Sequence, residues 1–208
     1  MAQGKVTQHN GQAQKSNTSA ADPRLHQRGK LLQQPHTVRQ MPFGLPAETR
    51  QKSAEALNQL LADTIMLYNM YKKHHWQVAG PTFYQLHLLF DKHAEEQLEL
   101  VDLIAERVQL LGGVAIGMPQ EVAALTKVEP PLSGVEEVPV MIDRLLEAHQ
   151  LIMTEARALA KTADDSDDLG TNDLVVSNVL RTNELQMWFV AEHVVDVPTV
   201  IADGNTRN

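Results

Sequence analysis

Four stretches in which apolar residues recur every three or four positions restrict this chain to helical folds. Gly80-Pro81 ends the first stretch, and Gly112-Gly113 ends the second, which Thr82 can cap at its start. Ser133 and Glu136 have the spacing of a capping box and open the third, with Pro139 tolerated in its first turn. The four predicted helices cover residues 47–78, 82–111, 133–163 and 171–196.

The connection between the second and third helices is long, with room for one short helix near residues 119–126. Aromatic residues are only 4% of the chain, which argues against a β-sandwich or barrel. The sequence therefore predicts an all-α four-helix bundle with one crossover, the ferritin-like connectivity. We expect a flexible basic arm over 1–46, the bundle over 47–197 and a tail over 198–208.

Composition excludes several classes of site. The 208 residues include no cysteine, so disulfides, iron–sulfur clusters and thiol nucleophiles are ruled out. No stretch approaches the roughly 20 apolar residues of a membrane span. The N-terminus lacks the apolar core of a signal peptide, and we expect a cytoplasmic protein without membrane partners.

Charge is distributed unevenly along the chain, whose net charge is −8. Residues 1–47 carry six basic side chains and one acidic one, whereas the remaining 161 residues carry 12 basic and 25 acidic ones. The basic arm can reach for phosphate, including DNA, or anionic lipid, while the acidic body repels DNA and attracts cations. An ordinary disordered extension would have the same composition.

Two pairs of ligand-type side chains lie on one stripe of the second helix. His87 and Asp91 are four residues apart, as are Asp102 and Glu106, so each pair projects from one face. The pairs are separated by about 16 Å along the helix, too far to share one ion. In a two-fold dimer with antiparallel helices, each His/Asp pair would face the partner's Asp/Glu pair. His75, at the end of the first helix, can add a third ligand.

Carboxylates mixed with imidazoles suit Fe(II), and open coordination positions would admit peroxide or dioxygen. Charged side chains four residues apart usually decorate a solvated face, so spacing alone leaves both interpretations open. The position of this stripe beside the apolar side of a helix favours a metal centre, because unpaired carboxylates are costly there.

The residues from His75 to Asp91, HWQVAGPTFYQLHLLFD, followed by VDLIAER from Val101 and LGG from Leu111, resemble the Dps family. These are dodecameric mini-ferritins named as DNA-binding proteins from starved cells, and the resemblance covers roughly residues 45–197. It implies a ferroxidase centre formed by residues at the positions of His75, His87 and Asp91 of one subunit and Asp102 and Glu106 of its two-fold mate. All five positions hold the family residue.

The resemblance further implies a shell of 12 subunits that stores iron as Fe(III) mineral, with hydrogen peroxide as the usual oxidant. Zinc is a candidate competitor for the same ligands. Iron entry would use acidic pores at the three-fold axes, where Asp164 and Asp173 fall in several relatives. Asp165, Asp167 and Asp168 add to this field, although a solvated loop would look the same.

Several other residues have two interpretations. Trp76 could accept an electron from stray oxidation, or simply pack at the dimer interface. His74 and His93 are not generally required by the family, and His93 is expected at the surface or lining the interior. His149 and His193 are expected to be structural histidines, and Glu95 and Glu99 are candidates for mineral nucleation. A second metal site in the arm could be formed by Asp22, His26 and His36, with His9 or Glu48.

The sequence is compatible with three interpretations of the function. The first is oxidation of Fe(II) by peroxide at shared interface sites, followed by storage of the mineral. The second is a nucleoid protein that binds DNA weakly, without sequence preference and in a strongly salt-dependent way, through its basic tails. The third, a bundle with a vestigial site, is disfavoured because all five ligand positions are intact.

Overall fold

The protein is represented by a computed structural model that describes residues 30–195. Four long helical segments account for most of this part of the chain. The elements are α1 (Ala47–Gln77), α2 (Phe83–Leu110), the short α3 (Pro119–Leu125), α4 (Val138–Asp165), α5 (Leu169–Leu174), the π-helix η1 (Val175–Leu180), α6 (Arg181–Ala191) and the 3₁₀ turn η2 (Glu192–Val194).

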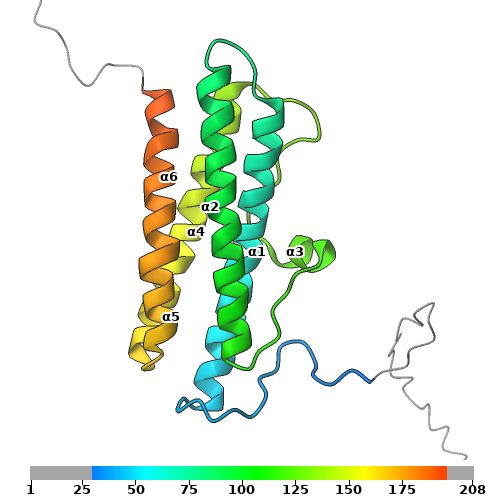
Figure 1. The fold of residues 1–208 in the computed structure, drawn as a ribbon, viewed down its shortest axis with the longest axis vertical. Helices are drawn as coiled ribbons and strands as arrows, with labels where there is room; N and C mark the ends of the chain where they lie inside the picture. The colour runs from blue at the N-terminus through cyan, green and yellow to red at the C-terminus, as the bar shows by residue number, and fades with distance from the viewer. Residues whose placement is uncertain (1–29, 196–208) are drawn as a thin grey trace, which may run out of the picture. The chain divides into compact units, whose positions relative to one another are not determined.

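The four long segments pack side by side as a bundle (Figure 1). The fourth is continuous through α5, η1 and α6, and α3 lies against α1 within the long connection. Residues 30–195 contain no β-strand. The predicted all-α, ferritin-like bundle with a short helix in the crossover is therefore confirmed.

Two glycines end helices as predicted, and each has a conformation that suits glycine. Gly80 has φ +101° in the turn between α1 and α2, and Gly112 has φ +82° directly after α2. A Cβ at Gly112 would also lie 3.0 Å from the carbonyl oxygen of Arg39. Thr82 occupies the N-cap position of α2, but its side chain makes no capping hydrogen bond.

The capping box predicted for the third helix is wrong. The N-cap of helix α4 is Glu137, four residues after Ser133, and the helix begins at Val138, although Pro139 does lie in its first turn. Glu136 is engaged elsewhere, because its carboxylate accepts three hydrogen bonds from the Arg144 guanidinium at 2.7–3.0 Å. A carboxylate held by arginine in this way cannot reach back to cap a helix.

The core forms where the apolar stripes of the helices meet, around Leu57 and Leu61 of α1 and Phe90 and Ile104 of α2. Leu98, which the helical spacing places on the buried side of α2, is instead 50% exposed. Its inward neighbour Gln97 is fully buried, so a polar residue occupies the core position.

Residues 33–46 precede α1 without forming a helix, yet they hydrogen bond to the bundle. Arg39 N–H and Gln33 Nε2 both donate to the Gly112 carbonyl at 2.9 Å, and Arg50 Nη1 donates to the Arg39 carbonyl at 3.0 Å. Residues 1–29 and the predicted tail over 198–208 lie outside the described residues. Within the described part, no helix combines the length and apolar character that crossing a bilayer requires.

Candidate metal centre

His75, His87 and Asp91 come together where α1 ends and α2 begins. His75 is in the last turn of α1, and the turn at Gly80-Pro81 reverses the chain so that His87 lies opposite it. The two imidazole rings stack with their centroids 3.9 Å apart and their planes 21° from parallel. Asp91 lies one turn further along α2, with its Oδ1 3.8 Å from His75 Nε2.

The two imidazoles hold each other in place through the backbone. Nδ1 of His75 lies 2.8 Å from the His87 carbonyl oxygen, and Nδ1 of His87 lies 2.9 Å from the His75 carbonyl oxygen. A carbonyl only accepts hydrogen bonds, so each Nδ1 must carry the proton. In the neutral imidazole each Nε2 then has a free lone pair, the form in which histidine binds metal.

Lys72, which the sequence analysis did not single out, completes the surroundings of Asp91. Its Nζ lies 2.5 Å from Asp91 Oδ1, and this hydrogen bond is the main reason that the pKa of Asp91 is lowered from its ordinary value. The carboxylate is therefore ionised at neutral pH, and a cationic group already lies beside it. A metal ion at this carboxylate would have to displace the ammonium group.

Asp102 and Glu106 lie further along the same helix and do not join the first three residues. Both are exposed, and neither has an ion pair or side-chain hydrogen bond within residues 30–195. Glu106 borders an open hollow that Arg39 and Met41 also line. In the described part of one chain, no three His, Asp or Glu side chains gather closely enough to hold an ion. One chain thus carries two separate halves of the predicted site.

The aspartates around the predicted pore have different surroundings. Asp164 and Asp173 are exposed, and Asp173 accepts a hydrogen bond from Ser177 at 2.9 Å. Asp165 pairs with Lys161 at 2.8 Å. Asp168, expected to strengthen the acidic field, is instead fully buried, because Arg107 Nη2 binds its Oδ1 at 2.5 Å and its side chain caps α5.

The remaining candidates are dispersed. Trp76 is 72% exposed. Of the histidines, His193 and His36 are exposed. His74 is buried, and within the described residues its ring has no hydrogen-bond partner. Burial lowers the pKa of His74 to about 4. Glu48, Glu95 and Glu99 are exposed, with Glu48 paired to Lys52, and His9, Asp22 and His26 lie outside the described residues.

The expectation that His93 lies at the surface or lines the interior is wrong. It is 1% exposed and forms part of a polar network inside the bundle. His149 belongs to the same network, as expected of a structural histidine. A sequence signal existed, because His93 and Gln97 fall on the apolar stripe of α2, where an unpaired polar group is costly.

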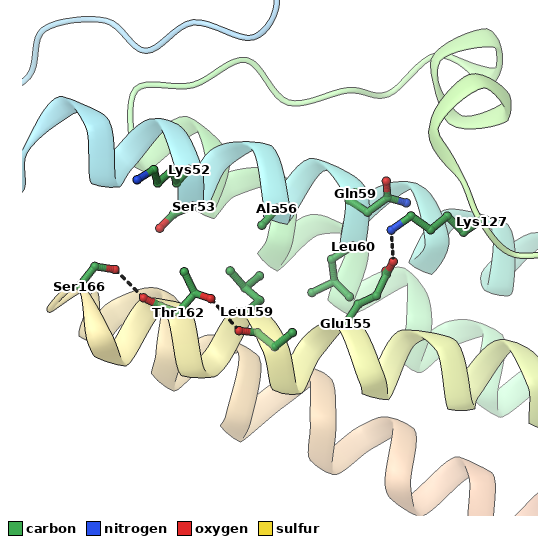
Figure 2. A pocket seen from close by; sticks show the side chains of 11 residues that line it. Lys52, Ser53, Ala56, Gln59, Leu60, Lys127, Glu155, Leu159, Thr162 and Ser166 are labelled. Carbon is green, nitrogen blue, oxygen red and sulfur yellow. Dashed lines mark hydrogen bonds and ion pairs between the residues drawn. The ribbon is translucent and has the colours of Figure 1, made fainter.

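A cavity of about 330 Å³ lies away from this site, between α1 and α4 (Figure 2). Its lining is mixed, with Leu60 and Leu159 beside Thr162, and Lys127 Nζ lies 2.6 Å from Glu155 Oε1 at one end. None of the predicted metal or pore residues lines it.

Comparison with known proteins identifies the family of this chain. The model of the ferritin-like domain family matches residues 54–200. A DNA protection during starvation protein from Agrobacterium fabrum is 32% identical over 152 residues, which cover 72% of this chain and 92% of that protein.

Solved structures give the same result. DpsC from Streptomyces coelicolor superimposes with a TM-score of 0.80 at 59% identity and covers 83% of this chain and 100% of its own. An archaeal Dps homologue from Halobacterium salinarum gives a TM-score of 0.79 at 26% identity, with 84% and 97% of the two chains covered.

Proposed function

This chain belongs to the ferritin-like domain family, and within it to the Dps proteins, and from this membership we propose that it stores and detoxifies iron as a ferroxidase. Fe(II) is the substrate, hydrogen peroxide the preferred oxidant, and the Fe(III) product accumulates as mineral inside a shell, which we expect to be a dodecamer of two-fold dimers. Removal of both Fenton reactants together would protect the cell against oxidative stress.

The observation that carries this proposal is the pair of imidazoles whose Nε2 atoms are both free. The reciprocal bonds from each Nδ1 to the other residue's carbonyl orient the lone pairs of His75 and His87 before any metal arrives. With the Asp91 carboxylate they form a mixed nitrogen and oxygen donor set that suits Fe(II) and leaves positions open for peroxide.

Asp102 and Glu106 supply the other half from the two-fold mate. Their exposed carboxylates have no internal partner within residues 30–195, which is expected of groups that meet a cation on another surface. Since a two-fold interface is isologous, each dimer would hold two equivalent centres. At each centre two Fe(II) ions would give one electron each to hydrogen peroxide, which takes up two protons and becomes two waters.

Mixing two defective variants tests the shared site. His87→Ala removes the imidazole half, and an Asp102→Asn, Glu106→Gln double variant removes the acidic half. Each variant alone should lose rapid Fe(III) absorbance after anaerobic Fe(II) loading and one peroxide addition. Hybrid dimers contain one intact site, so a co-refolded equal mixture should recover about a quarter of the wild-type amplitude.

A control variant and two contrary outcomes complete the iron-oxidation test. Asp143→Asn removes an exposed carboxylate of α4, outside the proposed centre, and should oxidise iron like the wild type. Recovery of no activity in the mixture would exclude sites shared across the dimer. Full activity in either variant alone would exclude the five residues as the catalytic centre.

Three finer assignments accompany this proposal. Asp164 and Asp173 would attract Fe(II) at the pores, and Trp76 would take up stray oxidising equivalents. Zinc would compete with iron at the centre. Asp164→Asn with Asp173→Asn should slow iron uptake at low Fe(II) without changing the rate at saturating Fe(II).

A second function, binding of DNA through the basic arm, is favoured by the excess of basic over acidic side chains in residues 1–47. Deletion of residues 1–29 removes much of this charge and keeps Gln33 and Arg39, which hydrogen bond to the bundle. We expect the deletion to abolish DNA retardation and to leave iron oxidation intact. DNA binding by the truncated protein would refute the role of the arm.

A further inference from the structure

A chain of buried hydrogen bonds crosses the middle of the bundle next to the candidate centre. The Tyr71 hydroxyl lies 2.6 Å from His149 Nε2 and 3.1 Å from His93 Nδ1. On its other side, His149 Nδ1 lies 2.8 Å from Asn183 Oδ1. None of these four side chains is more than 1% exposed, so the phenol has two imidazoles as neighbours and is shielded from solvent.

Asn183 determines which atom carries each proton in this chain. Its Nδ2 donates to the Val179 carbonyl at 2.8 Å, within the π-helix η1, and this turns Oδ1 toward His149. Because Oδ1 only accepts, Nδ1 of His149 carries the proton and its Nε2 has a free lone pair. Tyr71 therefore donates to His149, and His93 Nδ1 donates to the Tyr71 oxygen.

The burial of these groups keeps the chain in this protonation state. Burial raises the pKa of the Tyr71 phenol well above its ordinary value, and it lowers the pKa of His149 to about 4. At neutral pH the phenol is thus protonated and the imidazole neutral. The phenol does not release a proton by itself, but a phenol that loses an electron becomes a strong acid, and a base lies 2.6 Å away.

We propose that Tyr71 is a one-electron donor to the peroxide reaction at the metal centre, with His149 as the acceptor of its proton. This inference rests on the proposed ferroxidase function and addresses the case in which a centre holds a single Fe(II). Peroxide needs two electrons to become water, one Fe(II) supplies only one, and the incomplete reaction releases hydroxyl radical.

Tyr71 supplies the missing electron in this scheme. One Fe(II) becomes Fe(III), Tyr71 becomes a neutral phenoxyl radical, and the phenol proton moves to Nε2 of His149. The peroxide takes up the two electrons together with two protons from solvent and leaves as two waters. A later Fe(II) reduces the radical, and His149 returns the proton to the phenolate oxygen.

The position of Tyr71 fits this role. It precedes His75 by four residues, which is about 6 Å along the axis of α1. Its ring packs against Phe90, the neighbour of Asp91, with centroids 5.9 Å apart. Within residues 30–195 neither Tyr68 nor Tyr84 hydrogen bonds to a histidine, so Tyr71 is the tyrosine with a proton acceptor in the described structure.

The experiment loads the full-length protein anaerobically with one or two Fe(II) per centre, adds hydrogen peroxide and freezes the mixture within milliseconds. Electron paramagnetic resonance detects the radical, and protein containing ring-deuterated tyrosine separates a tyrosyl from a tryptophanyl signal. Fe(III) absorbance and trapping of hydroxyl radical are recorded on the same preparations. The variants are Tyr71→Phe, His149→Gln and the matched control Tyr68→Phe.

With one Fe(II) per centre, the wild type and Tyr68→Phe should form a tyrosyl radical, and Tyr71→Phe should lose it and release more trapped hydroxyl radical. His149→Gln retains the phenol but lacks the base, and should also lose the signal. Thermal melting of each variant shows whether it is folded.

Each of four results would count against the inference. If Fe(III) forms normally but Tyr71→Phe keeps the wild-type tyrosyl signal, or the wild type shows none, Tyr71 is not the donor and the ferroxidase proposal stands. If no Fe(III) forms in the wild type, both proposals fail, and the absorbance trace distinguishes this case. A full radical yield in His149→Gln would refute the role of His149.

Discussion

Replacement of Lys72 by methionine should tighten the binding of Fe(II) to the centre. In the structure the Lys72 ammonium lies 2.5 Å from Asp91 Oδ1, where a metal ion would bind. Methionine keeps much of the aliphatic length of the side chain and removes the charge. The substitution therefore tests whether this cation competes with iron.

The expected size follows from Coulomb's law. Asp91 is 39% exposed, so a water-like dielectric applies, and an ammonium roughly 5 Å from a divalent ion costs about 1.7 kcal/mol. The partly exposed pair between Lys72 and Asp91 adds at most about 1 kcal/mol that binding must overcome. Together these costs come to about 1.7–2.7 kcal/mol, and since about 1.4 kcal/mol corresponds to a tenfold change, the dissociation constant should fall roughly 15- to 85-fold.

Anaerobic equilibrium dialysis of Fe(II) at neutral pH and low salt measures this change. Lys73→Met is the matched control, because Lys73 is the next residue of α1 but donates to the Leu132 and Gly134 carbonyls instead of to Asp91. The difference between the two variants should shrink as salt is added. Equal Fe(II) affinity in the two variants, or weaker binding by Lys72→Met, would refute a metal site at Asp91.

The remaining predictions concern stability. Gly112→Ala should destabilise the protein by about 1–2 kcal/mol or more and lower its melting temperature, because Gly112 has a positive φ and a Cβ there would contact the Arg39 carbonyl. In the control variant Gly134→Ala the added Cβ meets nothing within 4 Å, so the melting temperature should change little. Asp168→Ala leaves the mostly buried guanidinium of Arg107 without its carboxylate and should cost about 3–5 kcal/mol in urea unfolding. Asp165→Ala, which breaks an exposed pair, should cost less than about 1 kcal/mol. His149 has a pKa of about 4 when folded and a higher one when unfolded, so the unfolded state binds the extra proton, and stability should fall as pH drops from about 6.5 toward 4. A His149→Gln variant should have a flatter profile of melting temperature against pH, and an equally steep profile would contradict this assignment.

The sequence predicted helix ends well where the signal was a backbone requirement and poorly where it was a side-chain contact. Gly80 and Gly112 mark real helix ends, because their positive φ is a local property that favours glycine. The capping box at Ser133 and Glu136 failed, because Arg144, two turns into α4, holds the glutamate. A competing partner from the folded structure cannot be seen in a four-residue pattern.

The candidate site shows the same division. The spacing of His87, Asp91, Asp102 and Glu106 already predicted two separated pairs on one helix, because helical rise determines their distance. Lys72 went unnoticed, because its contact with Asp91 depends on how α1 and α2 are packed against each other. His93 was misplaced for the same reason, since its burial depends on the helices that surround it.

The sequence alone thus determined the helical class, the turn at Gly80-Pro81 and the alignment of the ligand pairs on one helix. Each of these depends on the local backbone geometry of a short stretch of residues. Only the tertiary structure decided which nitrogen of His75 and His87 remains free, because that depends on carbonyl groups from two different helices. It also decided that Tyr71 meets His149, 78 positions away, in a buried chain. Contacts between distant residues depend on the packing of the whole bundle, and no local pattern encodes them.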